Sequence, residues 1–419
     1  MPSCFVTIAT PEYYARACVL RDSIREAMGT EVRFVVLAVS DAGGGGWLTD
    51  KVTWLTPDDL GLPFFWDMAF RYELFALANA LKPFLIAHVL RTTQTQDLVF
   101  LDADTTVLGP FLEVDVALAQ QGTSILLTPH ADRPQERSLP PTEIDLLRHG
   151  IINGGFIALN AGAAATAMVN WWCERMRTEC RYDPEHGLYG DQRWLDLVPS
   201  LFDEVRIFRH RGYNAAYWND PDRRPERRGE AWFVGDVPLR FYHFSRWNIE
   251  GGESLVAYKD LFYRSINLDR DRLLEDYRQS VIETKAVLPE PPVTRPFSLF
   301  SDGSSIPGIV RSAYSSAFGS REASHAELFT HGLEMVLQPC EDLPSFSRIA
   351  LPHLYATIWR LRKDLHTNRF DLMNRDGQLW FMEWVREYMQ GDYGVPDRAL
   401  GPAHHALAAA ADEPASDTA

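Results

Sequence analysis

The sequence predicts an α/β fold with a mainly parallel sheet, and two observations support this. Short apolar runs recur along the first part of the chain, and amphipathic segments separate them. The runs are apolar throughout rather than alternating, which is typical of parallel strands covered by helices on both faces. The chain of 419 residues, 46% hydrophobic and 23% charged, is also long enough for more than one folded unit.

The expected elements follow one another in a regular order. Residues 5–9 predict a buried strand, and residues 11–28 predict a helix with one apolar face. The remaining expected elements are strands at 32–39, 52–55, 98–101 and 124–127, a loop at 43–46, and a helix at 70–90 that Pro83 interrupts.

Composition divides the chain into four stretches. Residues 1–250 carry the α/β pattern, and residues 251–308 predict a charged helix followed by a proline-rich linker. Residues 309–400 predict a helical region rich in tryptophan, leucine and arginine, in which the aromatic spacing is typical of a core. Residues 401–419 are alanine-rich and acidic without a clear pattern, which predicts a disordered tail.

Charge and cysteine content exclude several classes of protein. With 41 basic and 57 acidic residues the net charge is −16, which would repel a nucleic-acid backbone. The five cysteines include no CxxC motif and match no zinc module, so we expect a reducing, cytoplasmic compartment. No charged leader or membrane-length apolar run is visible, so any membrane contact is expected to be peripheral, at the inner face.

The most informative segment reads VFLDADTTVLGPF, at residues 99–111. A buried strand ends at two aspartates, Asp102 and Asp104, whose i and i+2 spacing in an extended chain directs both carboxylates to the same side. Ligands of open α/β sheets bind at such strand ends, and paired carboxylates suit Mn²⁺ or Mg²⁺. The alternative is a solvated loop that follows a strand.

The same residues also resemble the haloacid-dehalogenase-like phosphatases, which carry Asp-x-Asp-x-Thr after an apolar strand. That resemblance would make Asp102 a nucleophile and Asp104 a general acid and base. Gly190-Asp191 followed by Asp196 resembles the last acidic motif of those enzymes. Against this interpretation, the nucleophile strand normally opens that fold, whereas here an α/β pattern precedes it.

Three further motifs contain residues suited to ligand binding. Asn153-Gly154-Gly155 lets a backbone approach a ligand closely, although it also fits a turn entering a strand. Asp191-Gln192 could bind sugar hydroxyls or could cap a helix. His243 ends an apolar run and could be a third metal ligand or a core histidine.

In this order the motifs resemble the retaining GT-A glycosyltransferases of the glycogenin and lipopolysaccharide galactosyltransferase type, over about residues 3–250. The resemblance implies a GT-A, Rossmann-like sheet flanked by helices, with residues 1–250 as the catalytic domain and a helical C-terminal appendage. It implies metal binding by Asp102, Asp104 and His243, and a catalytic pair formed by Asp191 and Gln192. The residues implied in donor binding are Thr7, Ala9, Tyr13, Lys82, Asp102, Asn153, Gly154, Gly155 and Arg246.

The chain departs from that family after His243, where Phe-Ser-Arg-Trp-Asn replaces the usual Gly and Lys-Pro-Trp, so Arg246 takes the place of a phosphate-binding lysine. The departure is typical of a divergent bacterial branch that builds surface polysaccharide. We therefore expect a metal-dependent retaining hexosyltransferase, using Mn²⁺ or Mg²⁺, that moves a sugar from a nucleotide-diphosphate sugar, with a UDP-sugar favoured, to a saccharide or lipid-linked acceptor. A phosphatase and a non-enzymatic sugar-nucleotide-binding or scaffold protein are the alternatives.

Residues 206–228 contain seven arginines and several aromatic residues. Arginine and aromatic side chains together suit an anionic or diphosphate-linked acceptor, and a solvated basic loop is the alternative.

Overall fold

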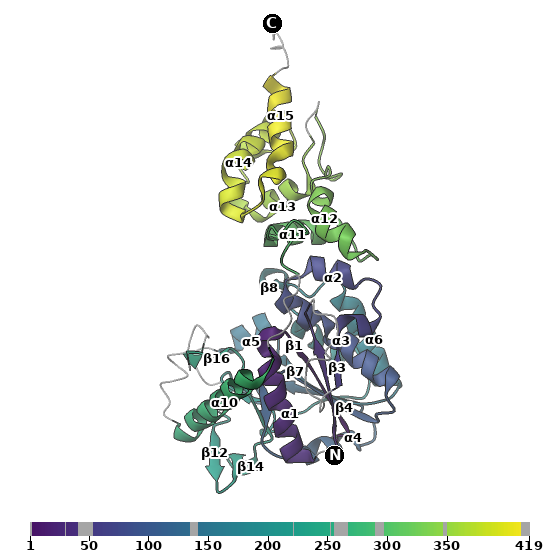
Figure 1. The fold of residues 1–419 in the computed structure, drawn as a ribbon, viewed down its shortest axis with the longest axis vertical. Helices are drawn as coiled ribbons and strands as arrows, with labels where there is room; N and C mark the ends of the chain where they lie inside the picture. The colour runs from purple at the N-terminus through teal and green to yellow at the C-terminus, as the bar shows by residue number, and fades with distance from the viewer. Residues whose placement is uncertain are drawn as a thin grey trace. The chain divides into compact units, whose positions relative to one another are not determined.

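The computed structural model describes residues 2–29, 31–40, 53–134, 141–220, 222–251, 253–254, 267–289, 297–346 and 350–411. The chain forms two compact units, Met1–Leu62 with Phe75–Thr294, and Pro63–Leu74 with Arg295–Ala419 (Figure 1). The glycine loop expected at 43–46 and most of the expected linker prolines lie outside the described residues.

A seven-stranded sheet forms the centre of the first unit, in the order β10-β6-β7-β4-β1-β2-β3. Its strands are β1 (Cys4–Ala9), β2 (Arg33–Ala38), β3 (Thr53–Leu55), β4 (Asp97–Leu101), β6 (Ile125–Pro129), β7 (Ile152–Asn160) and β10 (Val205–Ile207). Neighbouring strands are parallel except at β7, which is antiparallel to β4 and β6. The predicted α/β fold with a mainly parallel sheet is confirmed.

Helices pack around this sheet, and their apolar faces explain why they form. The helices of the first unit are α1 (Tyr14–Met28), α3 (Leu74–Thr92), α4 (Leu112–Leu118), α5 (Glu143–His149), α6 (Ala163–Met176), α7 (Gln192–Leu195), α8 (Val198–Leu201) and α10 (Leu268–Val287). Helix α3 continues through Pro83 instead of breaking there. It is long and apolar enough to span a membrane, but half of that stretch is buried inside the protein, as in a core helix.

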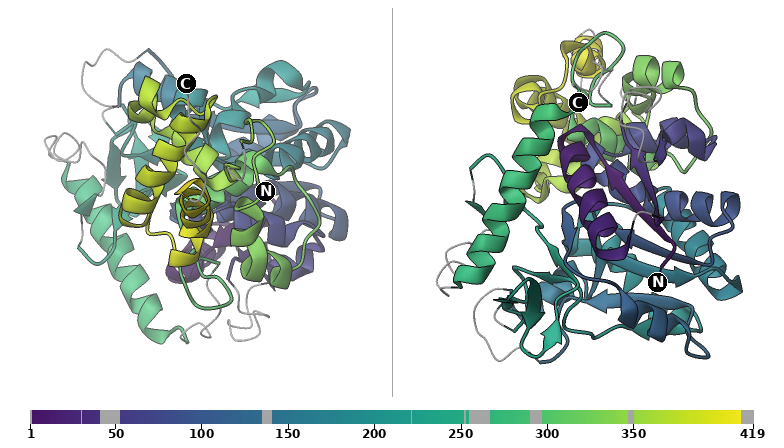
Figure 2. Two further views of the ribbon diagram at one scale, coloured as in Figure 1. Left: turned by 90° about the horizontal axis from the view of Figure 1, so that it is seen from above. Right: turned by 60° about the horizontal axis from the view of Figure 1, so that its bottom comes forward.

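Helix α10 packs along α1 and therefore belongs to the first unit, beyond the boundary expected at residue 250 (Figure 2). Tyr277 of α10 stacks on Phe244, with ring centroids 3.7 Å apart. Arg270 of the same helix pairs with the buried Asp220, at 3.0 Å between Nη1 and Oδ2. This helix thus stabilises the segment that includes His243.

A small second sheet, in the order β11-β15-β5, positions the functional residues. Strand β5 (Thr105–Val107) follows the DxD motif directly and runs antiparallel to β15 (Phe241–His243), with Thr105 opposite His243. Strand β11 (Ala215–Ala216) pairs with the other edge of β15. Two segments far apart in the sequence thereby meet at the end of β4.

The arginine-rich segment forms structure instead of an open basic loop. It contributes β12 (Pro225–Arg228), which pairs with β13 (Ala231–Val234) and then β14 (Val237–Pro238). Arg223 is buried and donates to the carbonyl of Tyr213 at 2.6 Å. Arg223 therefore serves folding and is not free to bind an acceptor.

The second unit is helical, as predicted for the C-terminal region, but it also takes in residues from the N-terminal half. Its helices are α2 (Phe65–Arg71), α11 (Gly308–Ala317), α12 (His325–Val336), α13 (His353–Leu361), α14 (Arg375–Tyr393) and α15 (Gly401–Ala411). The buried Arg311 donates to the carbonyls of Ala69, Phe70 and Tyr72, which satisfies the C-terminal end of α2. Helix α15 corrects the expectation of a disordered tail over residues 401–411, because Ala403 and Ala406 are buried.

Candidate active site

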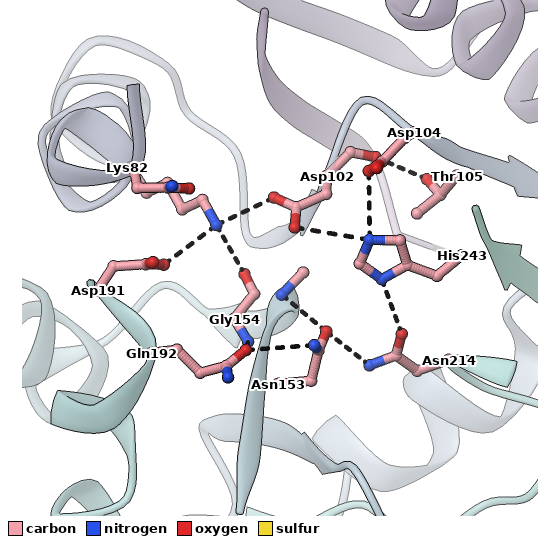
Figure 3. A network of polar contacts seen from close by, with 12 residues as sticks. Lys82, Asp102, Asp104, Thr105, Asn153, Gly154, Asp191, Gln192, Asn214 and His243 are labelled. Carbon is pink, nitrogen blue, oxygen red and sulfur yellow. Dashed lines mark hydrogen bonds and ion pairs between the residues drawn. The ribbon is translucent and has the colours of Figure 1, made fainter. Parts of the chain in front are cut away.

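Three potential metal ligands meet at the carboxyl end of β4 (Figure 3). Ligand atoms of Asp102, Asp104 and His243 all lie within 4.8 Å of one another. Nε2 of His243 is 3.2 Å from Oδ1 of Asp104 and 3.8 Å from Oδ2 of Asp102. The backbone N–H of Asp102 donates to the carbonyl of Gly155 at 3.0 Å, which anchors the motif to β7.

A chain of hydrogen bonds determines which nitrogen of His243 carries the proton. Oδ1 of Asn153 accepts from the backbone N–H of Gly155 at 2.9 Å, and it also accepts from Nδ2 of Asn214 at 2.9 Å. With its Nδ2 used there, Asn214 presents Oδ1 to Nδ1 of His243 at 3.2 Å. Nδ1 therefore donates to Asn214, and Nε2 is the ring nitrogen that faces the two aspartates and is available to a metal ion.

This donor set fits a divalent cation. Two carboxylates and a neutral imidazole nitrogen are suitable ligands for Mn²⁺, and a histidine oriented by a second hydrogen bond is typical of such sites. Burial would raise the pKa of Asp104, but the facing His243 lowers the pKa below its ordinary value, so the carboxylate is ionised near neutral pH.

Lys82 connects the metal motif to the Asp191-Gln192 motif. Its Nζ lies 3.0 Å from Oδ1 of Asp102, 3.0 Å from Oδ2 of Asp191 and 3.4 Å from the carbonyl of Gly154 (Figure 3). Burial alone would lower the pKa of Lys82, but the two carboxylates outweigh burial and raise it. All three N–H donors of Lys82 point at protein acceptors, so this side chain connects the two motifs. A contact between Lys82 and the phosphates of a donor stays a prediction.

Asp191 and Gln192 lie against the glycine turn of β7. Oε1 of Gln192 accepts from the backbone N–H of Gly154 at 3.2 Å, and its Nε2 donates to the carbonyl of His149 at 2.8 Å. Asp191 is buried, and this burial raises its pKa although Lys82 opposes the shift. These contacts hold both side chains in fixed orientations.

Two cavities meet at these residues. The larger, of about 260 Å³, is lined by Asp191, Gln192 and Asn153 among others, and the smaller, of about 170 Å³, by Thr10 and Tyr13 among others. The residues that line both cavities are Phe75, Asn79, Lys82, Asp102, His243, Ser245 and Arg246. The candidate metal ligands therefore lie where one elongated ligand could extend through both spaces.

The structure brings most of the predicted site residues together, with two exceptions. Thr7 and Ala9 are buried in β1, and Ile8 and Thr10 line the smaller cavity in their place. The strand alternation explains the shift, because residues next to each other in a strand face opposite sides of the sheet. Tyr13 does line the smaller cavity, as predicted.

Asn214 and His130 belong to the site but were not among the predicted site residues. Asn214 orients His243 from a left-handed backbone conformation with φ 58°, and His130 accepts from Nδ2 of Asn153 across 3.1 Å. Asn214 lies inside the arginine-rich segment, where its neighbours dominate the pattern. The available signal was an asparagine two residues after Gly212 and directly before a short strand, but this pattern is typical of any turn.

Gly155 has no room for a side chain. A Cβ there would lie 2.5 Å from Cε1 of His243 and 2.8 Å from both Oδ1 of Asn153 and Oδ2 of Asp102. We therefore expect Gly155→Ala to displace the metal ligands and to weaken Mn²⁺ affinity at least about tenfold, measured by isothermal titration calorimetry. Gly391→Ala is the control, because a Cβ there meets no atom within 4 Å. Equal Mn²⁺ affinities in the two variants would contradict this account of the site.

Comparison with known proteins gives partial matches. No protein-family model matches the chain. Over 115 residues it is 35% identical to the uncharacterized protein YfnF of Bacillus subtilis, covering 27% of this chain and 38% of that protein. Over 183 residues it is 28% identical to the uncharacterized protein YfnD of the same organism, covering 43% of this chain and 54% of that protein. The chain thus spans about half or less of the length of these relatives.

The solved structures to which the chain is similar include three glycosyltransferases. They include the galactosyltransferase LgtC with donor and acceptor sugar analogues, at 15% identity and a TM-score of 0.38, over 67% of this chain and 95% of that one. They also include GlyE of Streptococcus pneumoniae, at 10% identity and a TM-score of 0.38, over 72% and 67% of the two chains. Mouse xyloside xylosyltransferase 1 matches at 14% identity and a TM-score of 0.36, over 58% and 98%. All three TM-scores are below 0.5.

Proposed function

We propose that this protein is a metal-dependent glycosyltransferase that moves a sugar from a nucleotide-diphosphate sugar, with a UDP-sugar favoured, to a saccharide or lipid-linked acceptor. The observation that supports this most strongly is the cluster of Asp102, Asp104 and His243 at the junction of two cavities. A nucleotide sugar has the matching form, with a diphosphate between a nucleoside and a sugar.

The residues of each cavity suit one part of such a donor. Tyr13 and Thr10 offer an aromatic ring and a hydroxyl to a nucleobase and ribose in the smaller cavity. Asp191 and Asn153 offer polar groups to sugar hydroxyls in the larger one. Arg246 lines both cavities, donates from Nη2 to the Tyr189 hydroxyl at 3.3 Å, and offers a positive charge to the diphosphate between the two cavities.

The chemistry requires charge stabilisation on the leaving diphosphate. Asp102, Asp104 and His243 would hold a Mn²⁺ or Mg²⁺ ion, which when bound neutralises the negative charge that develops on the diphosphate. Arg246 adds a second positive charge at the same place. Lys82 keeps Asp102 and Asp191 in their positions while this charge develops.

We further propose that the transfer retains the anomeric configuration. An inverting enzyme needs a general base, and the carboxylates that line the larger cavity are already engaged. Asp102 and Asp191 pair with Lys82, and Asp145 accepts from the backbone N–H of Thr142 at 2.8 Å. Burial also lowers the pKa of the cavity residue His130 to about 3, which makes it a poor base.

Retention then follows a front-face course. The bond between the anomeric carbon and the diphosphate oxygen breaks, the acceptor oxygen bonds to that carbon on the same face, and the acceptor proton passes to the leaving diphosphate oxygen. The amide of Gln192, fixed by Gly154 and His149, can stabilise positive charge on the sugar but cannot remove a proton. Asp196, the alternative base, accepts from the backbone N–H groups of Ile151 and Ile152 and so supports β7.

Cellular context is part of the same proposal. All five cysteines are free and buried, which fits the cytoplasm, and we place the enzyme there or at the inner face of the membrane, in surface polysaccharide synthesis.

The test is a donor screen followed by NMR of the product. We expect one nucleotide sugar among UDP-, GDP- and dTDP-sugars to be consumed with Mn²⁺ and spared with EDTA, and proton NMR to show an α-linked product from an α-linked donor. A β-linked product would contradict retention. Hydrolysis of simple phosphomonoesters that is lost in Asp102→Asn would instead establish the phosphatase alternative.

A further inference from the structure

Two aromatic side chains are exposed at the rim of the larger cavity. Phe75, in the first turn of α3, is 63% exposed, and Tyr182, on β8 (Tyr182–Asp183), is 41% exposed. Both line the larger cavity, and their ring centroids are 5.5 Å apart with an angle of 31° between the planes. Large aromatic rings left in water beside a cavity are typical of a surface that a ligand covers.

The ring of Tyr182 is held in place by its surroundings. The hydroxyl of Tyr182 accepts from Nδ2 of Asn79 at 2.8 Å, and its ring packs edge-on against Tyr189 at 5.2 Å. Gly190 has a φ of 58°, and a Cβ there would lie 2.7 Å from the Tyr182 hydroxyl oxygen. These contacts keep the ring of Tyr182 in one orientation and reduce the entropy that binding would cost.

The chain connects these rings to the reaction centre. Tyr182 pairs with Tyr189 in the hairpin of β8 and β9 (Leu188–Tyr189), and Gly190 and then Asp191 follow directly. A ligand that covers the rings would therefore present its far end to Asp191 and Gln192. That is the side from which an acceptor must approach the sugar of the donor.

We propose that Phe75 and Tyr182 form a stacking platform for a pyranose ring of the acceptor, so that the acceptor is a saccharide at its reactive end. This inference rests on the proposed function. A pyranose ring has an apolar face of C–H groups that packs on aromatic rings, and it carries hydroxyl groups around its edge. The polar groups near the platform, on Asn79, Gln192 and Arg246, suit those hydroxyls.

The same polar groups argue against a lipid chain on the platform. An acyl chain would cover the amide of Asn79 and the guanidinium of Arg246 without offering hydrogen bonds, which costs free energy for each buried polar group. A nucleobase is the other competitor, because Phe75 also lines the smaller cavity. Among the described residues, Tyr182 lines the larger cavity, with Asp191 and Gln192, and does not line the smaller one. The platform therefore lies on the side of the sugar and not on the side of the nucleobase.

The test measures acceptor and donor binding separately. The probes are the methyl β-glycosides of glucose, galactose and N-acetylglucosamine, observed by saturation-transfer NMR in the presence of UDP and Mn²⁺, and UDP alone, titrated by calorimetry. We expect ring-proton saturation from at least one glycoside in the wild type. Phe75→Ala and Tyr182→Ala should each weaken that binding by about tenfold, since each removes one stacking face. UDP affinity should stay unchanged in Tyr182→Ala and should fall less than glycoside affinity in Phe75→Ala, because Phe75 also lines the smaller cavity.

Two controls separate stacking from general effects. Tyr182→Phe keeps the ring and should retain most of the binding, and Trp380→Ala removes an aromatic residue that is also 41% exposed, in the second unit, and should have no effect. Three results would each overturn the platform. The first is saturation of an added octyl-chain detergent in place of the sugar protons, and the second is no binding of any glycoside. The third is a loss of UDP affinity in Phe75→Ala equal to the loss of glycoside affinity. Glycoside binding without any affinity for UDP and Mn²⁺ would overturn the proposed function and leave the platform standing.

Discussion

Asp104→Asn should reduce kcat/KM for the favoured nucleotide sugar by about 10³-fold or more, the largest loss of activity expected in this protein. The substitution keeps the size of the side chain but removes the charge that faces Nε2 of His243 at 3.2 Å. Because Asp104 follows the buried strand β4 and precedes β5, the variant should fold normally. Steady-state kinetics with increasing Mn²⁺ would measure the effect.

The control for this variant is Asp203→Asn, which neutralises an exposed aspartate of the same unit. It changes the net charge equally and should leave activity unchanged. If Asp104→Asn keeps more than about one tenth of the wild-type activity, the carboxylate is not a metal ligand, and the proposed role of the DxD motif is wrong.

Lys82→Met should give the largest loss of stability. The side chains of Lys82 and Asp191 are only 5% and 6% exposed, so removal of the ammonium leaves a buried carboxylate without a partner. Breaking such a buried pair costs about 3 to 5 kcal/mol of unfolding free energy, which urea denaturation can measure. The double variant Lys82→Met/Asp191→Asn should recover part of this loss but no activity, because both motifs would still be misplaced.

The pH dependence of this loss follows from the raised pKa of Lys82. A lysine with a raised pKa contributes its stabilisation fully below its unfolded pKa of about 10.4 and loses it only as pH rises through the higher folded value. The stability difference between wild type and Lys82→Met should therefore be constant between about pH 6 and 9. A difference that disappears within this range would show that Lys82 is not charged in the pair.

The sheet and the DxD motif were predictable because both depend on local sequence. Apolar runs identify buried strands whatever their partners are, and the strand before Asp102 gives its two carboxylates a direction. His243 was predicted from the order of motifs, and its contact with Asp104 depends on the pairing of β15 with β5, which no local pattern reveals.

The remaining features depend on contacts between distant segments. The role of Lys82 depends on Asp191, which lies on another element, so the sequence indicated a basic residue at the site but not its partners. Asn214 acts only through His243 and Asn153. Helix α2 lies between elements of the first unit in the sequence but belongs to the second unit, where Arg311 donates to its last carbonyls.

The most direct test of the account is an anomalous diffraction map of crystals soaked with Mn²⁺ and UDP. We expect one strong peak at the manganese edge, about 2.0 to 2.6 Å from carboxylate oxygens of Asp102 and Asp104 and from Nε2 of His243, with the diphosphate of UDP on the same ion. A map without a peak at these three residues, or with phosphate bonded to Asp102, would contradict the proposal that this is a metal-dependent glycosyltransferase.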